Sequence, residues 1–315
     1  MSSLVRPPYL QPGDTIAIVP TARAIEQEEL QDGIALAERW GLKVRLGQGI
    51  GRKHFQQAGT AEERAADLQA AIDDPAVKAI WCARGGYGTV HLLEHLRFDA
   101  LLTQPKWLVG FSDITVLHNA LHNLGVCSLH AQMPFMVGAK TPETRETLRK
   151  ALFGEDYAIT TPAHAFNRNG EATGVLIGGN LSVLCSLRGT SYDIDPRGKI
   201  LLLEDLDELL YHLDRMVMNL QVGGWFSGLA GLVLGHMIKM HDLKETDPFG
   251  QHAEEIISRA IGNTSYPVCF NFPADHDADN RALVLGQKTK LSVTSEGATL
   301  SYASSFPTGE GRDRV

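Results

Sequence analysis

Apolar and polar residues alternate in regular blocks along the first half of the chain. Largely apolar runs at 14–20, 77–83 and 106–110 are typical of strands that are buried on both faces. Between them, residues 24–41 and 60–75 place apolar side chains at helical spacing. Strands that alternate with helices in this way predict an α/β layered arrangement with a mostly parallel sheet.

The pattern changes after about residue 150. Residues 151–172 hold short extended pieces and polar breaks, which are typical of a connection. The apolar strand at 198–205 precedes a predicted helix, and further strand-like segments lie at 230–238, 267–273 and 283–293. The apolar residues that recur at helical spacing in the predicted helix are Leu206, Leu209, Leu210, Leu213, Val217 and Leu220.

These patterns divide the chain into three parts. We expect a mostly parallel, layered α/β domain at 1–150, a linker at 151–172, and a smaller mixed α+β domain at 173–315.

The composition argues against two classes of partner. The formal net charge of −8 at pH 7 leaves no basic field to attract nucleic-acid phosphates. The longest apolar runs, such as 228–235, are too short to span a bilayer, and the first residues contain no apolar core of a secretory signal. The four cysteines are far apart, form no CxxC pair and indicate reduced core residues. We therefore expect a soluble cytoplasmic protein.

Ser112 stands between an apolar strand and a helix, in the sequence GFSD, with Gly110 two residues before it. A serine in this place can be a helix N-cap. It can also be a nucleophile on the strained turn of a G-x-S-x-G elbow, where the helix dipole stabilises a developing oxyanion. The match to the elbow is partial because Ile114 replaces its last glycine. The serine alone leaves both interpretations open.

The segment ARGGYG at 83–88 also follows a predicted strand. Its glycines allow a close approach of the backbone, and its amides can point at an anion. It can equally be a turn that begins a helix. It matches neither of the glycine-rich phosphate-binding motifs, so it is no nucleotide signature.

Two residues of the second half could serve the serine as acid and base. Glu204 is the first charged residue after four apolar positions, and His276 follows a predicted strand in the sequence PADHDADN. A serine nucleophile needs a base to take its proton, and the base needs an orienting acid. Ser112, Glu204 and His276 supply these three groups at strand-to-loop junctions. We expect the acids beside Glu204, which are Asp205, Asp207 and Glu208, to be solvated loop charges.

Other hydrolytic chemistries lack their motifs. No SxxK pair and no HExxH sequence is present, and the histidines and acids at 235–252 fit no recognised set of metal ligands. We therefore expect no metal and no cofactor.

Five longer blocks of the chain carry a family resemblance. In order, they read ARGGYGTVHLLEHL, WLVGFSDITVLHNAL, IGGNLSVLCSLRGT, LLLEDLDELLYHLDRMVMNL and FPADHDADNRALVLG. Together they resemble the LD-carboxypeptidase family of serine peptidases, over roughly residues 7 to 295 of the chain. The resemblance implies an N-terminal α/β domain with a nucleophile elbow and a C-terminal domain with the acid and base. It makes Ser112 the nucleophile, Glu204 the acid and His276 the base.

The resemblance also implies a substrate and its binding groups. It suggests an oxyanion hole made by backbone amides of Gly86 and Asp113. The substrate-side loop would be Gly178, Gly179 and Asn180, and the arginines that could bind the peptide carboxylate are Arg84, Arg215 and Arg281. The implied reaction releases terminal D-alanine from a murein tetrapeptide during peptidoglycan recycling, and the implied assembly is a homodimer.

The chain departs from the family pattern in a few places. Asp275 stands where the family usually has glycine before the base, and Asp277 follows; two flanking acids should favour the protonated imidazole of His276. Val284 replaces a proline, which we expect to be harmless. Residues 129–134 differ from the usual H-G-P, so no role is assigned to His130.

Two other functions fit the same resemblance. The microcin-immunity branch of the family cleaves peptidyl-nucleotides, and such an enzyme would need an aromatic platform, for which Trp225, Phe226 or Tyr192 are candidates. The other is a relative that binds its ligand without catalysis, which the presence of all three triad residue types disfavours.

Overall fold

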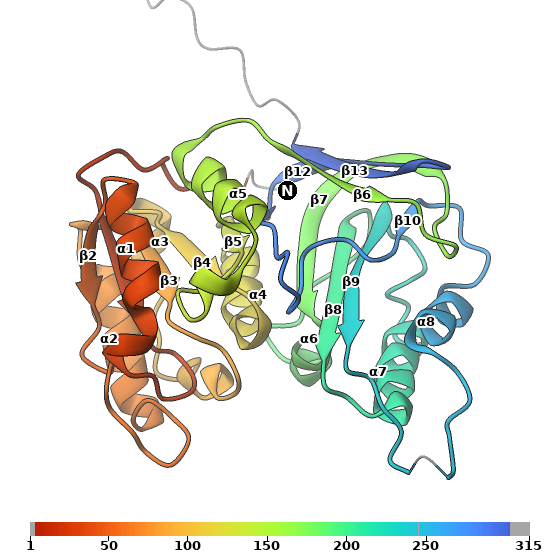
Figure 1. Cartoon of the computed structure of the whole chain (residues 1–315), viewed down its shortest axis with the longest axis horizontal. Helices are drawn as coiled ribbons and strands as arrows, with labels where there is room; N and C mark the ends of the chain where they lie inside the picture. Colours follow the sequence, from red (N-terminus) through yellow and green to blue (C-terminus); the bar gives the residue numbers. More distant parts are fainter. Residues whose placement is uncertain (1–3, 245, 303–315) are drawn as a thin grey trace, which may run out of the picture.

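The computed structural model describes residues 4–244 and 246–302, which form two sheets that lie side by side (Figure 1). The six-stranded sheet has the order β11-β5-β4-β3-β1-β2, and all of its neighbours are parallel except β11 and β5. Its strands are β1 (Thr15–Val19), β2 (Lys43–Leu46), β3 (Val77–Cys82), β4 (Trp107–Gly110), β5 (Ser128–His130) and β11 (Leu283–Leu285). The predicted parallel α/β organisation of the first half is confirmed.

The helices of the first half connect these strands. They are η1 (Gln27–Leu30), α1 (Gln31–Arg39), α2 (Ala61–Asp73), η2 (Thr89–Leu92), α3 (Ala100–Thr103), η3 (Ser112–Ile114), α4 (Thr115–Leu124), η4 (Val137–Ala139) and α5 (Pro142–Phe153). α2 begins where its sequence favours a start: Thr60 Oγ1 accepts the amide of Glu63, and the carboxylate of Glu63 accepts the amide of Thr60.

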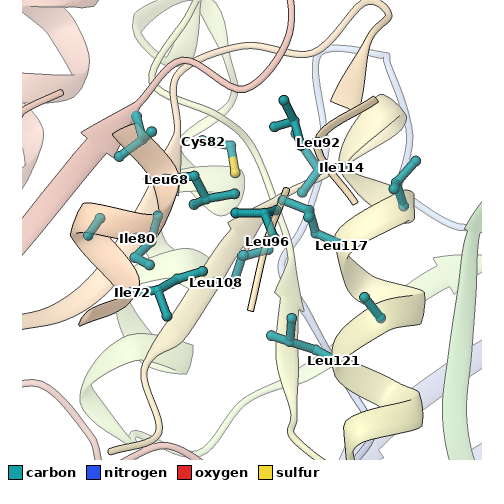
Figure 2. Packing of buried hydrophobic residues seen from close by; sticks show 14 of the residues in the cluster. Leu68, Ile72, Ile80, Cys82, Leu92, Leu96, Leu108, Ile114, Leu117 and Leu121 are labelled. Atoms are coloured by element: carbon teal, nitrogen blue, oxygen red, sulfur yellow. The ribbon is translucent and has the colours of Figure 1, made fainter. Parts of the chain in front are cut away.

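One face of the first sheet buries its apolar side chains beneath α2 and α4, and the opposite face is buried beneath α1 and α5. Figure 2 shows Leu68 and Ile72 of α2 packed with Ile80 of β3 and Leu108 of β4, and Leu117 of α4 completing the cluster. Each of these side chains is at most 1% exposed. Close packing of these side chains fixes the position of α4 relative to β4.

The second sheet has seven strands in the order β10-β9-β8-β7-β12-β13-β6. The four strands from β7 to β10 are parallel, and the other neighbours are antiparallel. Its strands are β6 (Ala158–Pro162), β7 (Gly170–Asn180), β8 (Ile200–Leu206), β9 (Gly231–Ile238), β10 (Val268–Cys269), β12 (Lys288–Thr294) and β13 (Gly297–Tyr302), and its helices are α6 (Leu181–Leu187), α7 (Leu210–Val222) and α8 (Ala253–Ile261). The mixed character predicted for this half is confirmed.

Strand pairing does not follow the boundaries that the sequence predicts. β6 lies within the segment expected as a linker, yet it pairs with β13 in the second sheet. β11 lies in the second half of the sequence, yet it pairs with β5 in the first sheet. The N-terminal end of α4 contacts the end of β7, because Asn180 donates its amide to Oγ1 of Thr115 at 3.0 Å. These contacts bring the carboxyl ends of β4 and β8 to the same region.

Candidate active site

Ser112 lies on a strained turn between β4 and α4. Its φ of +63° is in the left-handed region that residues with a side chain seldom adopt, while Phe111 before it is extended. Its hydroxyl caps neither η3 nor α4. A Cβ at Gly110 would lie 2.8 Å from Cγ1 of Ile114, so glycine is required for the turn to close over the isoleucine. The geometry is that of an elbow and excludes the N-cap interpretation.

The glycine loop at 83–88 packs against this turn. A Cβ at Gly85 would lie 3.4 Å from Cβ of Ser112 and 3.6 Å from the amide nitrogen of Asp113. Asp113 ties the two segments together, because its carboxylate accepts hydrogen bonds from the amide and the hydroxyl of Thr89 at 2.9 and 2.6 Å. Burial raises the pKa of Asp113. Gly86 follows with a φ of +113°.

His276 and Glu204 form a hydrogen-bonded pair. Nδ1 of His276 lies 2.8 Å from Oε2 of Glu204, which is fully buried in β8, whereas the imidazole is 16% exposed. Burial alone would lower the pKa of His276, but the charge and the hydrogen bond of Glu204 outweigh it, and Asp205 and Asp275 add to them, so the pKa is raised. Because Nδ1 bonds to the acid, Nε2 is the nitrogen that remains for a substrate or a serine.

The acid–base pair lies next to the serine turn. The imidazole ring of His276 is 4.8 Å from the ring of Phe111, which immediately precedes Ser112. On the other side, Glu204 pairs in register with Asn180, whose amide binds the start of α4. Ser112, Glu204 and His276 therefore come from three separate elements to one region of the molecule.

The loop at the end of β7 has internal partners. A Cβ at Gly178 would lie 2.1 Å from the carbonyl oxygen of Leu202, and one at Gly179 would lie 2.5 Å from Oγ1 of Thr115. The side chain of Asn180 caps α6 and is 5% exposed. The GGN sequence thus permits close packing between β7, β8 and α4, and contact of these residues with substrate stays a prediction.

Asp205 is not the solvated loop charge that we expected. It is 2% exposed and accepts hydrogen bonds from Nδ2 of Asn180 at 2.8 Å and from the amides of Ser182 and Leu206, both at 2.9 Å. Burial and the neighbouring charge of Glu204 raise the pKa of Asp205 to about 7. The prediction was wrong because β8 continues to Leu206, which leaves both acids inside the sheet.

The three candidate arginines have different surroundings. Arg84 lies over the ring of Phe135 at 4.2 Å, and Arg281 pairs with Asp279 at 2.8 Å. Arg215 is exposed on α7. Contact of any of them with a substrate carboxylate stays a prediction.

Two of the three aromatic residues considered for stacking on a nucleobase, Trp225 and Phe226, cannot serve this purpose. Trp225 and Phe226 are only 4% and 3% exposed and belong to the core of the second half. Tyr192 packs against the core of the first half, with its hydroxyl near the carbonyl of Leu93 at 3.5 Å. Stacking on a base requires a free ring face, which the two buried rings lack.

The loop that carries His276 is held by groups that the sequence analysis missed. Nζ of Lys140 donates to the carbonyl oxygens of His276, at 3.1 Å, and Asp277. From the second half, His236 bonds to Asp275. Lys140 lies in a loop with no motif, so no local pattern could have indicated it.

Within 4–244 and 246–302, no group of three or more His, Cys, Asp or Glu side chains is arranged to hold a metal ion, and no helix there is long and apolar enough to cross a membrane.

Comparison with known proteins identifies two matching domains. The LD-carboxypeptidase N-terminal domain matches residues 16–131, and the LD-carboxypeptidase C-terminal domain matches residues 173–291. The chain is 31% identical over 301 residues to a probable murein peptide carboxypeptidase of Bacillus subtilis, covering 94% of each chain. It is 32% identical to the murein tetrapeptide carboxypeptidase of Pseudomonas aeruginosa, covering 88% of this chain and 92% of that one.

Solved structures share the two-domain fold. Muramoyltetrapeptide carboxypeptidase from Oxalobacter formigenes superposes with a TM-score of 0.83 at 29% identity, covering 93% of this chain and 100% of that one. The microcin C7 self immunity protein MccF, in complex with aspartyl sulfamoyl adenosine, has the same TM-score at 20% identity, covering 95% and 99%. The second likeness extends to the fold alone.

Proposed function

This chain belongs to the LD-carboxypeptidase family, and we propose that it is a serine-type enzyme that releases terminal D-alanine from murein tetrapeptides. The substrate is supported by the names of its murein-peptide relatives. The serine mechanism rests on one observation: a hydrogen-bonded His276–Glu204 pair lies beside a serine with a φ of +63°.

The geometry supports a covalent mechanism in two stages. Oγ of Ser112 attacks the carbonyl carbon of the peptide bond while Nε2 of His276 takes its proton. Glu204 holds the imidazole through Nδ1 and stabilises its charged form. When the tetrahedral intermediate collapses, the C–N bond breaks and His276 gives its proton to the amine of the departing D-alanine. Water, deprotonated by the same histidine, then hydrolyses the acyl-serine.

The oxyanion of the intermediate needs fixed donors. The amides of Gly86 and Asp113 are our candidates, because the glycine loop packs against the serine turn. Each such donor contributes about 3 kcal/mol to transition-state stabilisation in other serine hydrolases. A homodimeric assembly remains a prediction from the family resemblance, and a cytoplasmic location remains a prediction from the composition of the chain.

Release of D-alanine tests this function. The purified protein would be incubated with L-Ala-D-Glu-meso-diaminopimelate-D-Ala, and the products would be followed by mass spectrometry. We expect release by the parent enzyme and by Ser186→Ala, whose serine is exposed on α6, but none by Ser112→Ala. Release by a folded Ser112→Ala protein would refute the serine mechanism.

The same incubation separates the two alternatives. A peptidyl sulfamoyl adenylate would replace the tetrapeptide, and we expect it to be cleaved poorly because Trp225 and Phe226 are buried. Cleavage of the adenylate alone would assign the chain to the peptidyl-nucleotide hydrolases. Tight tetrapeptide binding with no reaction toward a fluorophosphonate probe would indicate a relative that binds without catalysis.

A further inference from the structure

Asp275, directly before the proposed base, is a fully buried carboxylate with a complete set of partners. Its Oδ2 accepts hydrogen bonds from the amide of His236 at 2.9 Å and from Nδ1 of the same residue at 2.7 Å. Its Oδ1 accepts the amide of Asp277 at 2.7 Å. The carboxylate thus bridges from β9 to the residue that follows His276, and it closes an Asx-type turn around the base.

The strand that binds Asp275 also contacts the acid. At Gly235, the residue before His236, a Cβ would lie 2.9 Å from Cβ of Glu204 and 3.2 Å from Cβ of Asp275. Glycine therefore lets the acid strand and the base loop approach β9 together. The two adjacent residues Gly235 and His236 set the position of Glu204 relative to the loop that carries His276.

Hydrogen bonds from the first half of the chain also hold this loop. Lys140 donates to the carbonyl oxygens of His276 and Asp277, and the amide of Thr141 donates to the carbonyl of Ala278 at 3.1 Å. These contacts bind main chain only. They fix where the loop runs, whereas the Asp275 carboxylate fixes the turn from which the imidazole projects.

We propose that His236 and Asp275 form a positioning pair that holds the imidazole of His276 against Glu204. This inference rests on the proposed role of His276 as base. Neither residue of the pair is itself assigned contact with the substrate. A glycine at position 275 could not form this pair, because it has no carboxylate to accept the hydrogen bonds of His236.

Acidic groups close to His276 and His236 favour the charged form of both imidazoles. Burial disfavours the charged form of His276, whereas Glu204, Asp205 and Asp275 favour it. Asp275, Asp277 and Glu254 favour the charged form of His236. The hydrogen bond that His236 donates to the Asp275 carboxylate raises the pKa of His236, although burial opposes this. The His236 side chain is 38% exposed and borders a cavity of about 350 Å³, so its protonation can follow the solvent.

Two substitutions remove the pair in different ways. Asp275→Asn has nearly the same shape, but it removes the charge and offers only one carbonyl oxygen to the three donors. His236→Phe keeps the ring and the backbone amide but removes the Nδ1 donor. His236→Asn places an amide donor near the Nδ1 position and serves as the conservative rescue. His212→Phe, which removes the partner of Glu208 on α7 at 3.4 Å, is the matched control.

Kinetics on the tetrapeptide measure the effect on the base. We expect kcat to fall by roughly 10- to 100-fold in Asp275→Asn and His236→Phe with KM within twofold, because a misplaced catalytic group costs this much. His236→Asn should recover most of the loss, and His212→Phe should match the parent. Folded Asp275→Asn and His236→Phe proteins with parental kcat would overturn the proposal.

A titration that needs no turnover separates this proposal from the proposed function. Histidine NMR signals would be followed against pH in the Ser112→Ala background, with His276 assigned by its loss in His276→Gln. We expect His236→Phe to lower the pKa of His276, because the charge of Asp275 is kept while the hydrogen bond between His276 and Glu204 is weakened. An unchanged His276 titration would refute the positioning pair even if D-alanine release proves the enzyme.

Discussion

At the scale of single residues, the site is explained by backbone strain and buried charge. Ser112 has a left-handed φ, and the turn around it requires glycine at position 110 because Ile114 occupies the space of a Cβ there. The elbow motif has a second glycine at position 114, and here the missing side chain of Gly110 supplies the required room. The partial motif alone left the elbow and the N-cap interpretations open, and the backbone of Ser112 decides for the elbow geometry.

The raised pKa of His276 predicts the pH profile. A base must be neutral to accept the serine proton, so activity should rise as pH passes upward through the raised pKa. The acidic limb of kcat/KM should therefore have its midpoint above the ordinary histidine value of about 6.5. Initial rates on the tetrapeptide between about pH 5 and pH 9 measure this midpoint. A midpoint at or below the ordinary value would contradict the charge arrangement around the imidazole.

Some residues could not be judged from sequence because the answer depends on long-range contacts. Asp205 resembles its neighbour Asp207 in the sequence, yet the first is buried with three donors and the second is exposed with a φ of +60°. The difference arises because β8 ends at Leu206, so that Asp205 lies inside the strand and Asp207 follows it. Likewise, Lys140 is 136 residues from His276, so no local pattern connects the two.

At the scale of elements, close approach between β7, β8 and α4 positions the acid relative to the serine. Gly178 and Gly179 both have positive φ and both face backbone or side-chain atoms at distances that no Cβ tolerates. The family resemblance implies that this GGN block is a substrate-side loop. In the structure, its two glycines allow close packing against Leu202 and Thr115, and Asn180 caps α6.

Substitution of Gly179 tests this packing. We expect Gly179→Ala to lower the free energy of unfolding by about 1–3 kcal/mol more than Gly189→Ala, because overpacking at a close contact costs this much. Gly189 is the matched control, since its φ is also positive, at +76°, but nothing lies within 4 Å of a Cβ there. Urea denaturation of both variants gives the comparison. Equal losses would show that the close approach to Thr115 is not required.

At the scale of the whole molecule, the site depends on both halves of the chain. Strand–helix alternation predicted the parallel first sheet, because each unit is local in sequence. The return of β11 to the first sheet and the pairing of β6 with β13 could not be predicted, since both join segments far apart in the chain. The contacts of Asn180 with Thr115 and of His276 with Phe111 bring Glu204 and His276 next to the turn that holds Ser112.

The most direct test of the central claim is whether the three residues act as one unit. Rates of D-alanine release would be compared for Ser112→Ala, Glu204→Gln, His276→Gln and the triple variant, with folding checked by circular dichroism. The account predicts that Ser112→Ala and His276→Gln each reduce kcat by at least about 10³-fold and that the triple variant is no worse than Ser112→Ala. Independent, additive losses, or a Ser112→Ala protein that still releases D-alanine, would contradict it.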